Sequence, residues 1–289
     1  MLSGFTIVRN AVKLDFPIVP AIRSVLDVCD EVVVNVGKSE DETRDLVASI
    51  DDPRIRILDS AWDLTQRNFM LSIETQRAMD ACRAPWGIYI QADEVLHETG
   101  AQILKANVAE WDGDARVEGL LVDYLHFYGG FDTVATSRRW YRREVRCVRL
   151  GQGRDIRPYQ GAQGFRVGDG NRKIRARVTG ARMFHYGWAR PAHAIKQKLE
   201  ISKTIYPWGR ERLDEELKRR YLEWIPLLRP FTGEHPRVAR EWIAARTHDP
   251  DRVIGPRHFK LEHLRFYVSD WIERWTGARV FEFRNYELA

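Results

Sequence analysis

The N-terminal third of this chain alternates between short apolar runs and segments with helical periodicity, and this alternation strongly constrains the fold. The apolar runs predict strands at residues 5–8, 31–36, 55–58 and 87–90. Helices are expected at 19–28, 42–50 and 68–82, with Asp41 as the N-cap of the second. Strands and helices that alternate in this way build a parallel, doubly wound sheet with right-handed crossovers.

The apolar run that begins at Trp86 ends at two carboxylates, Asp93 and Glu94. In open α/β sheets ligands bind outside the carboxyl ends of the strands, where a carboxylate can hold a hard divalent cation against substrate phosphates. Neighbouring side chains on an extended segment point to opposite sides, so we expect Asp93 rather than Glu94 to reach a metal. For Glu94 and His97, a solvated turn before a helix is the alternative.

Composition excludes several classes of protein. Hydrophobic residues make up 44% of the 289 residues, yet no run approaches the roughly 18 consecutive apolar residues of a membrane helix. The N-terminus lacks the pattern of a signal peptide, so we expect a cytoplasmic protein. Cys29, Cys82 and Cys147 have neither disulfide nor zinc-site spacing and are expected in the core. The net charge of +5 suits nucleic acid, an anionic membrane or phosphorylated substrates, and composition does not choose among them.

Two polar loops follow the first two predicted strands. The first, Val8 to Ala11, offers backbone amides and short polar side chains to a base or ribose, with a structural turn as the alternative. The second contains Gly37-Lys38-Ser39, which superficially resembles a P-loop, but that motif needs a glycine where this chain has Val32. A Gly-rich dinucleotide turn is also absent after the first strand. We therefore reject a P-loop NTPase, and a nicotinamide dehydrogenase is not expected.

Arg67 and Asn68 begin the third predicted helix, and an arginine beside a free helix N-terminus can hold an anion. Capping alone explains Asn68, and a surface salt bridge is an equal alternative for Arg67. His185 lies among aromatic residues at the end of a short strand, where a histidine is more often a hydrogen-bonded core residue. It becomes a candidate metal ligand because the carboxylate site needs further ligands, and this combination suits manganese better than magnesium.

After Asp93 the pattern changes to a short helix near 102–110 and a β-rich stretch from 117 to about 184, part of it antiparallel or mixed. From residue 191 the pattern is mostly helical, with segments expected at 192–205, 210–224, 236–246 and 259–275. Aromatic residues in these helices more often mark packing than a cofactor site. For the last helix, contact with a membrane surface or a second copy is the alternative.

In this order, the motifs resemble those of the bacterial family 2 glycosyltransferases of the GT-A fold. Thr6 to Asn10 resembles the first nucleotide-binding strand and loop, and Val34 to Thr43 the second. Gln66-Arg67-Asn68 matches the start of the third helix, Gln91 to Glu94 the Asp-x-Asp site, and His185-Tyr186 the histidine that completes the metal shell. The specificity lies in the ordered set, which covers roughly residues 4–190, rather than in any single motif.

The resemblance implies an α/β fold of GT-A type: a doubly wound, mixed but mainly parallel sheet with helices on both faces, followed by a C-terminal helical extension. It divides the chain into a catalytic domain at 1–190 and the extension at 191–289. Within the catalytic domain, the nucleotide-binding part covers about 1–98 and the acceptor part about 99–190.

The implied reaction transfers a sugar from a nucleotide-diphosphate-sugar donor to a hydroxyl of a glycan or glycolipid, as in polysaccharide biosynthesis, with inversion. Mn²⁺ or Mg²⁺ bound by Asp93 and His185 would neutralise the departing diphosphate. As general base we select Asp155 over Asp123, Asp132 and Glu144, although each could equally form a surface ion pair. Donor contacts are expected from Val8, Arg9, Asn10, Gly37, Ser39, Asp41, Thr43, Arg67, Asn68, Gln91, Ala92 and Asp93.

The chain departs from the family pattern at several positions. Gln91 replaces an acid that commonly contacts the nucleotide, so a weaker metal affinity is expected. Ala11 replaces another frequent acid, and Asn35 and Gly37 replace an acid and a serine. Recognition of the base and ribose is therefore expected to differ, with Asp15 or Asp41 as compensating groups.

Two other functions are weighed against this one. A nucleotidyltransferase would usually show a Gly-rich basic loop after the first strand, which this chain lacks. A non-catalytic protein that binds nucleic acid or an anionic surface is suggested by the pI near 9.1. For the glycosyltransferase no nucleic-acid partner is expected, whereas peripheral contact with the inner face of the membrane and a homo-oligomer through the C-terminal helices are considered.

Overall fold

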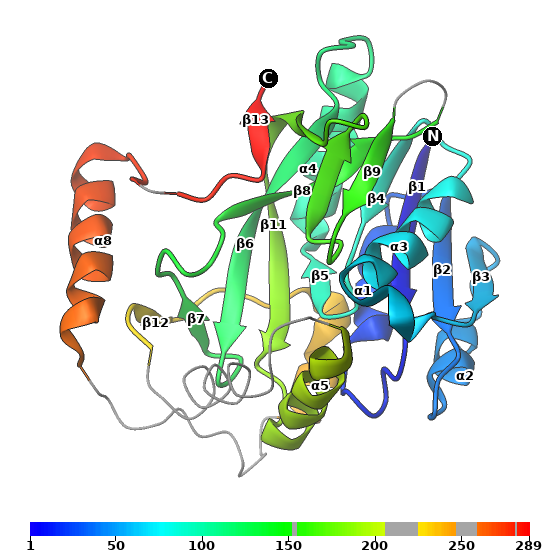
Figure 1. Cartoon of the computed structure of the whole chain (residues 1–289), viewed down its shortest axis with the longest axis horizontal. Helices are drawn as coiled ribbons and strands as arrows, with labels where there is room; N and C mark the ends of the chain where they lie inside the picture. The colour runs from blue at the N-terminus through cyan, green and yellow to red at the C-terminus, as the bar shows by residue number, and fades with distance from the viewer. Residues whose placement is uncertain (152–154, 206–224, 247–258, 281) are drawn as a thin grey trace.

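One large mixed sheet organises the molecule (Figure 1), and the computed structural model describes residues 1–151, 155–205, 225–246, 259–280 and 282–289. The four strands predicted in the N-terminal third are all present. They are parallel, in the order β3-β2-β1-β4. Their bounds are Leu2–Val8 for β1, Glu31–Gly37 for β2, Ile55–Ser60 for β3 and Trp86–Tyr89 for β4.

The sheet continues beyond β4 with strands of both directions, which confirms the mixed sheet expected after Asp93. β8 (Arg143–Arg149) pairs antiparallel with β4 and with β6 (Gly119–Tyr128), and β11 (Arg172–Trp188) runs parallel to β6. An antiparallel hairpin of β9 and β10 then forms the far edge. The remaining strands have these bounds: β5 Glu94–Leu96, β7 Thr133–Ala135, β9 Ile156–Tyr159 and β10 Gly164–Val167.

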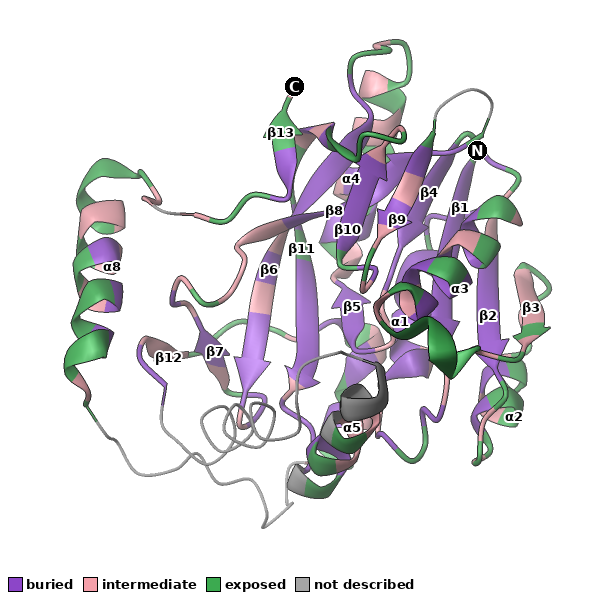
Figure 2. Ribbon diagram, in the orientation of Figure 1, coloured by how far each residue is buried: buried purple, intermediate pink, exposed green. Residues whose placement is uncertain are grey.

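Helices cover both faces of the parallel part, as expected for a doubly wound sheet. Alternate residues of β1 face opposite sides: Leu2 and Val8 pack with one core cluster, and Phe5 and Ile7 with another. Strands β1, β2 and β4 are buried along most of their length, as Figure 2 shows, whereas the edge strand β3 is mostly half-buried. The first cluster is covered by α1 (Ile18–Leu26), α2 (Thr43–Ala48) and α4 (Glu98–Trp111), and the second by α3 (Met70–Asp80).

The third predicted helix begins later than its sequence pattern suggests. A 3-10 segment, η1 (Leu64–Phe69), precedes α3, and Arg67 interrupts it with φ 44° and ψ −118°. The predicted helix at 102–110 lies inside the longer α4. His97 is its N-cap, since the Nδ1 atom accepts the Thr99 N–H at 3.3 Å. His97 therefore has a structural role at a helix start.

The part of the chain after residue 190 contains helices as expected, but it is not exclusively helical. Strands β12 (Leu228–Pro230) and β13 (Tyr286–Leu288), which were not predicted, pair with β7 and β11 and tie this part into the sheet. The expected helix at 210–224 lies outside the described residues. The helices among the described residues after 190 are α5 Ala192–Ile205, η2 Arg237–Ala239, α7 Arg240–Ala244, η3 Leu261–His263 and α8 Leu264–Thr276. Among the described helices, none is long and apolar enough to span a bilayer.

Candidate functional site

A pocket of about 180 Å³ lies at the carboxyl ends of β1 and β4. The chain passes from β1 to β2 and β3 on one side and returns to β4 on the other, so this is the switch point of the sheet, where ligands of open α/β folds bind. The pocket is lined by residues of both strand ends and of α3, α5, the 160s turn and nearby loops: Ile7, Val8, Arg9, Asn10, Leu14, Phe16, Trp62, Met70, Leu71, Tyr89, Gln91, Ala92, Asp93, Gly161, Gln163, Lys198 and Ile201.

The two polar loops predicted from the sequence lie side by side and are joined by hydrogen bonds. The Asn10 N–H donates to Ser39 Oγ at 3.0 Å, and the Ala11 N–H donates to Thr43 Oγ1 at 2.6 Å. In return Asn10 Oδ1 accepts the Glu40 N–H at 2.9 Å. Asn10 is buried and has φ 55°, a conformation that asparagine tolerates well. Ser39 and Thr43 thus shape the first loop from outside the pocket lining.

Asp41 has a similar supporting position. Its carboxylate accepts the Lys13 N–H at 2.7 Å and the Thr43 N–H at 3.1 Å, at the first residue of α2. Glu42 holds the formal N-cap position, one residue after the predicted one, while the Asp41 side chain provides the capping hydrogen bond. Asp41 also lies outside the pocket lining, so the second loop positions the first one.

Trp62 lines the pocket, and no sequence motif indicated it. A Cβ atom at Gly37 would lie 2.5 Å from Trp62 Nε1, so glycine at this position lets the indole pack against the end of β2. The indole N–H donates to Ser60 Oγ at 3.1 Å, which fixes the ring. Gly37 therefore contributes to the pocket through Trp62 rather than by direct lining.

Asp93 is the buried acid of the pocket, with 6% of its surface exposed. Its Oδ2 atom lies 2.8 Å from Lys198 Nζ, which α5 supplies, and 3.8 Å from His185 Nε2. Burial alone would raise the pKa of the carboxyl, but the positive charges of Lys198 and Arg190 outweigh burial and hold this pKa below its ordinary value. Asp93 is therefore an anion at neutral pH.

A chain of hydrogen bonds orients His185. The Tyr141 carbonyl can only accept, so His126 Nε2 donates to it at 2.8 Å, and His126 Nδ1 must accept from His185 Nδ1 at 3.0 Å. Burial lowers the pKa of His126 to about 3 and that of His185 to about 4, so both rings are neutral. The lone pair of His185 Nε2 then points toward Asp93, an arrangement that suits a metal ligand.

The donor set fits a divalent cation in its chemistry, with one competitor. A carboxylate oxygen from Asp93 and an imidazole lone pair from His185 are donors that Mn²⁺ accepts, and substrate oxygens would complete the shell. Within the described ranges, no group of three or more His, Cys, Asp or Glu side chains gathers as a ready metal site. The competitor is the Lys198 ammonium, which forms an ion pair with Asp93 Oδ2, the carboxylate oxygen that the cation would use.

The neighbours of Asp93 have distinct roles. Glu94 is completely buried on the other side of the chain and pairs with Arg146, so the alternative of a solvated turn is wrong for it. Gln91 lines the pocket, and its Nε2 atom donates to the Ala162 carbonyl at 3.1 Å, which ties the β9–β10 turn to the pocket. Asp93 and Gln91 therefore line the pocket, and Glu94 does not.

The structure does not bring every predicted site residue to the pocket. Arg67 is exposed at the kink of η1 and, like Asn68, lies outside the lining, since α3 begins only at Met70. Asp155 is exposed before β9 and pairs with Arg157 at 3.2 Å, whereas the pocket touches the opposite end of the hairpin. The structure gives no support for Asp155 as the base. The other candidate acids, Asp123, Asp132 and Glu144, also lie outside the lining.

No protein-family model matches the chain. No curated protein matches it either. Among solved structures, S. aureus TarS 1–349 in complex with UDP shares 16% identity at a TM-score of 0.38, over 47% of this chain and 38% of that chain. Glucosyl-3-phosphoglycerate synthase from Mycobacterium tuberculosis in complex with Mn²⁺, UDP and glucosyl-3-phosphoglycerate shares 17% identity at a TM-score of 0.29, over 45% of each chain. The match spans less than half of these structures, and likenesses this small carry no argument about function.

Proposed function

We propose that the chain is a glycosyltransferase that binds a nucleotide-diphosphate sugar in the pocket between β1 and β4. The observation that carries this proposal is the composition of one cavity at the switch point of the sheet. Trp62 supplies aromatic surface for a base or sugar, and Arg9 and Lys198 supply positive charge for a diphosphate. The Arg9 side chain is held in place because its Nε donates to the Lys38 carbonyl at 2.9 Å.

The charges suit the departure of a diphosphate. In the transfer, the bond from the anomeric carbon to the diphosphate oxygen breaks and a bond to the acceptor hydroxyl oxygen forms, so negative charge grows on the diphosphate. Fixed positive charge close to that oxygen stabilises the transition state. Arg190, 2% exposed, is a further cation whose charge acts on Asp93, although it does not line the pocket. If Mn²⁺ or Mg²⁺ binds, Asp93 and His185 would hold it, and the cation would add to this neutralisation.

The acceptor side of the proposal rests on α8. Leu261, Leu264, Val268, Trp271 and Trp275 follow a spacing of alternately three and four residues along η3 and α8, and all five are exposed. Such a stripe is unusual on a monomer surface, and tryptophan favours the membrane interface. We propose that this stripe contacts an anionic bilayer that carries a glycolipid acceptor, consistent with the net charge of +5.

The proposal is tested by titrating the purified protein with UDP-, GDP-, dTDP- and CMP-sugars and by identifying the products. We expect one donor to bind and to release a nucleoside phosphate, and Arg9→Ala to weaken its binding by about tenfold, as for the loss of a charged hydrogen bond. Arg44→Ala, an exposed arginine outside the pocket, is the matched control. Release of pyrophosphate from a nucleoside triphosphate would instead identify a nucleotidyltransferase. Absence of binding to any donor would overturn the proposal.

A further inference from the structure

We infer that Lys198 is the resident cation of the diphosphate site, so that the donor binds without a divalent metal and Lys198 and a metal exclude each other at Asp93. This inference rests on the proposed function and concerns the charge that holds the diphosphate. It replaces the expectation of a metal-dependent site with a property of this chain's own side chains.

The Lys198 ammonium is surrounded by one carboxylate and two aromatic rings. Its Nζ lies 2.8 Å from Asp93 Oδ2, and it also lies 5.6 Å from the centre of the Phe16 ring and 5.9 Å from that of Trp188. Aromatic faces at this distance attract a cation. Three contacts from three separate parts of the chain therefore fix the charged end of one lysine, and that end faces the pocket.

The same contacts make Lys198 compete with a divalent ion for the Oδ2 atom of Asp93. A metal bound to the Oδ2 atom would lie beside the ammonium, and two positive charges this close repel strongly in a buried site. A charged lysine has no lone pair with which to ligate the ion. The backbone of Gly187 lies close to the same oxygen, since an added Cβ would lie 2.7 Å from Asp93 Oδ2 and 2.6 Å from His185 Nε2.

The charges of the residues around the pocket also favour diphosphate binding without a divalent metal. Position 91, which borders the pocket beside Asp93, holds a neutral glutamine, and its amide is already used by the Ala162 carbonyl. Among the described residues that line the pocket, Asp93 is the single acid and Arg9 and Lys198 are the two bases, which leaves one positive charge for the diphosphate. A site that used a divalent ion would gain from a second acid here, because dehydrating such an ion is costly.

Two measurements test the inference. The first titrates wild-type protein with UDP, GDP and dTDP separately, by calorimetry, in EDTA and in Mn²⁺. We expect the nucleotide that binds to do so with nearly the same affinity in both. Loss of its binding in EDTA would overturn the inference and leave the proposed function intact, whereas binding of none of the nucleotides would overturn the proposed function.

The second measurement follows Mn²⁺ alone by electron paramagnetic resonance. We expect weak binding by wild type and binding at least about tenfold tighter by Lys198→Met, because the repelling charge is gone. The gain should disappear in the double variant Asp93→Asn/Lys198→Met. Lys198→Met should also bind nucleotide only when Mn²⁺ is present, while Lys198→Arg should still bind it in EDTA.

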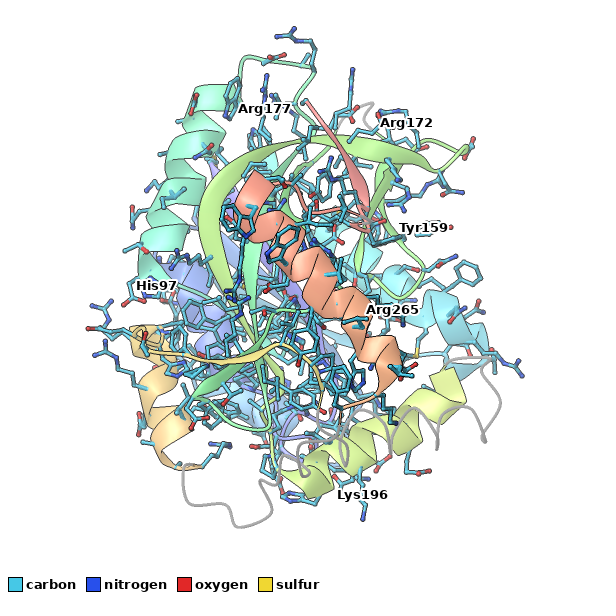
Figure 3. All side chains as sticks on the ribbon, turned by 90° about the vertical axis from the view of Figure 1, so that its left-hand side faces the viewer. His97, Tyr159, Arg172, Arg177, Lys196 and Arg265 are labelled. Atoms are coloured by element: carbon cyan, nitrogen blue, oxygen red, sulfur yellow. The ribbon has the colours of Figure 1, made fainter. Side chains whose placement is uncertain are left out.

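Lys196→Met is the matched control, since Lys196 lies on the exposed side of α5 and points away from the body of the protein (Figure 3). It should behave like wild type in both measurements. Equal Mn²⁺ affinity in wild type and Lys198→Met would contradict the inference. If Lys198→Met does not fold, the wild-type comparison of EDTA with Mn²⁺ decides the question without it.

Discussion

Glu94 and Arg146 form an ion pair in which both side chains are completely buried. Arg146 Nε donates to Glu94 Oε2 at 2.9 Å, and Arg146 Nη2 donates to Oε1 at 2.8 Å. The Tyr124 hydroxyl and the Gln91 N–H donate to the two oxygens at 2.7 and 3.0 Å. Because Glu94 follows Asp93 directly, this pair anchors the turn that carries the acid of the pocket.

Removing the charge of Glu94 should destabilise the protein strongly. Glu94→Gln leaves Arg146 buried without its counter-charge, and breaking such a pair typically costs about 3–5 kcal/mol of unfolding free energy. Urea denaturation measures the change. Glu110→Gln, at an exposed position of α4, should change the unfolding free energy by less than about 0.5 kcal/mol. A loss of similar size in both variants would show that the pair does not anchor the turn.

Gly187 should be essential for the geometry of Asp93 and His185. Gly187→Ala places a methyl group 2.6 Å from His185 Nε2 and 2.7 Å from Asp93 Oδ2, closer than real contacts allow. We expect nucleotide binding to weaken by about tenfold and the unfolding free energy to fall by about 1–3 kcal/mol. Gly113→Ala, whose added methyl would meet nothing within 4 Å, is the control. Unchanged nucleotide affinity in Gly187→Ala, measured by calorimetry, would contradict this geometry.

The raised pKa of Glu144 should make the unfolding free energy depend on pH. Burial raises the pKa of this carboxyl to about 7 from 4.5, against the opposing effect of Arg146. Between these two values the unfolded chain releases the proton while the folded protein keeps it, so stability falls as pH rises, by about 1.4 kcal/mol per pH unit. The effect is absent below the unfolded pKa and complete above the folded one.

Glu144→Gln removes this titration. The unfolding free energy of the variant minus that of wild type should increase by about 2–3 kcal/mol when the pH is raised from about 5 to about 8. The substitution also alters the hydrogen bond with Asn285, which changes the unfolding free energy by the same amount at pH 5 and pH 8. The test is therefore the change of the free-energy difference with pH. Urea denaturation at the two pH values measures it. A difference between variant and wild type that does not change with pH would show that Glu144 is ionised in the folded protein.

The parallel strands of the N-terminal third and the place of Asp93 could be predicted because both follow from local patterns. Apolar runs mark buried parallel strands, and an acid after such a run must lie at the ligand-binding edge. Lys198 could not be predicted as its partner, because helical periodicity in 192–205 does not tell which loop the helix covers. Arg67 lies outside the pocket lining for a related reason: the helix expected from residue 68 begins only at Met70, after a kink at Arg67 with φ 44°.

Trp62 and Gly37 show a second limit of the sequence. Gly37 was expected to contact the nucleotide because it lies in a loop after a strand, yet its role is to admit the indole of a residue in the next loop. Such a close approach depends on how β2 and β3 align, which no local pattern encodes. The same applies to Asp155, since the register of the β9–β10 hairpin decides which of its ends meets the pocket.

The exposed stripe of α8 gives the last prediction. α8 lies to one side of the sheet (Figure 1), where Arg138 and Arg229 hold it through Glu273 and Asp270 at 3.1 and 2.6 Å. These ion pairs turn the acids of the helix toward the body of the protein. Trp271 and Trp275, 61% and 76% exposed, are left on the outer side.

We expect wild-type protein to sediment with vesicles of phosphatidylcholine and phosphatidylglycerol at low salt, and much less with phosphatidylcholine alone. Trp271→Ser/Trp275→Ser should reduce the bound fraction by about tenfold or more, because each indole contributes buried apolar area at the interface. Val178→Ser, at an exposed apolar position on β11, should leave it unchanged. If wild type ignores the vesicles but forms dimers that the double variant abolishes, the stripe joins two copies of the chain instead, and the proposed membrane contact is wrong.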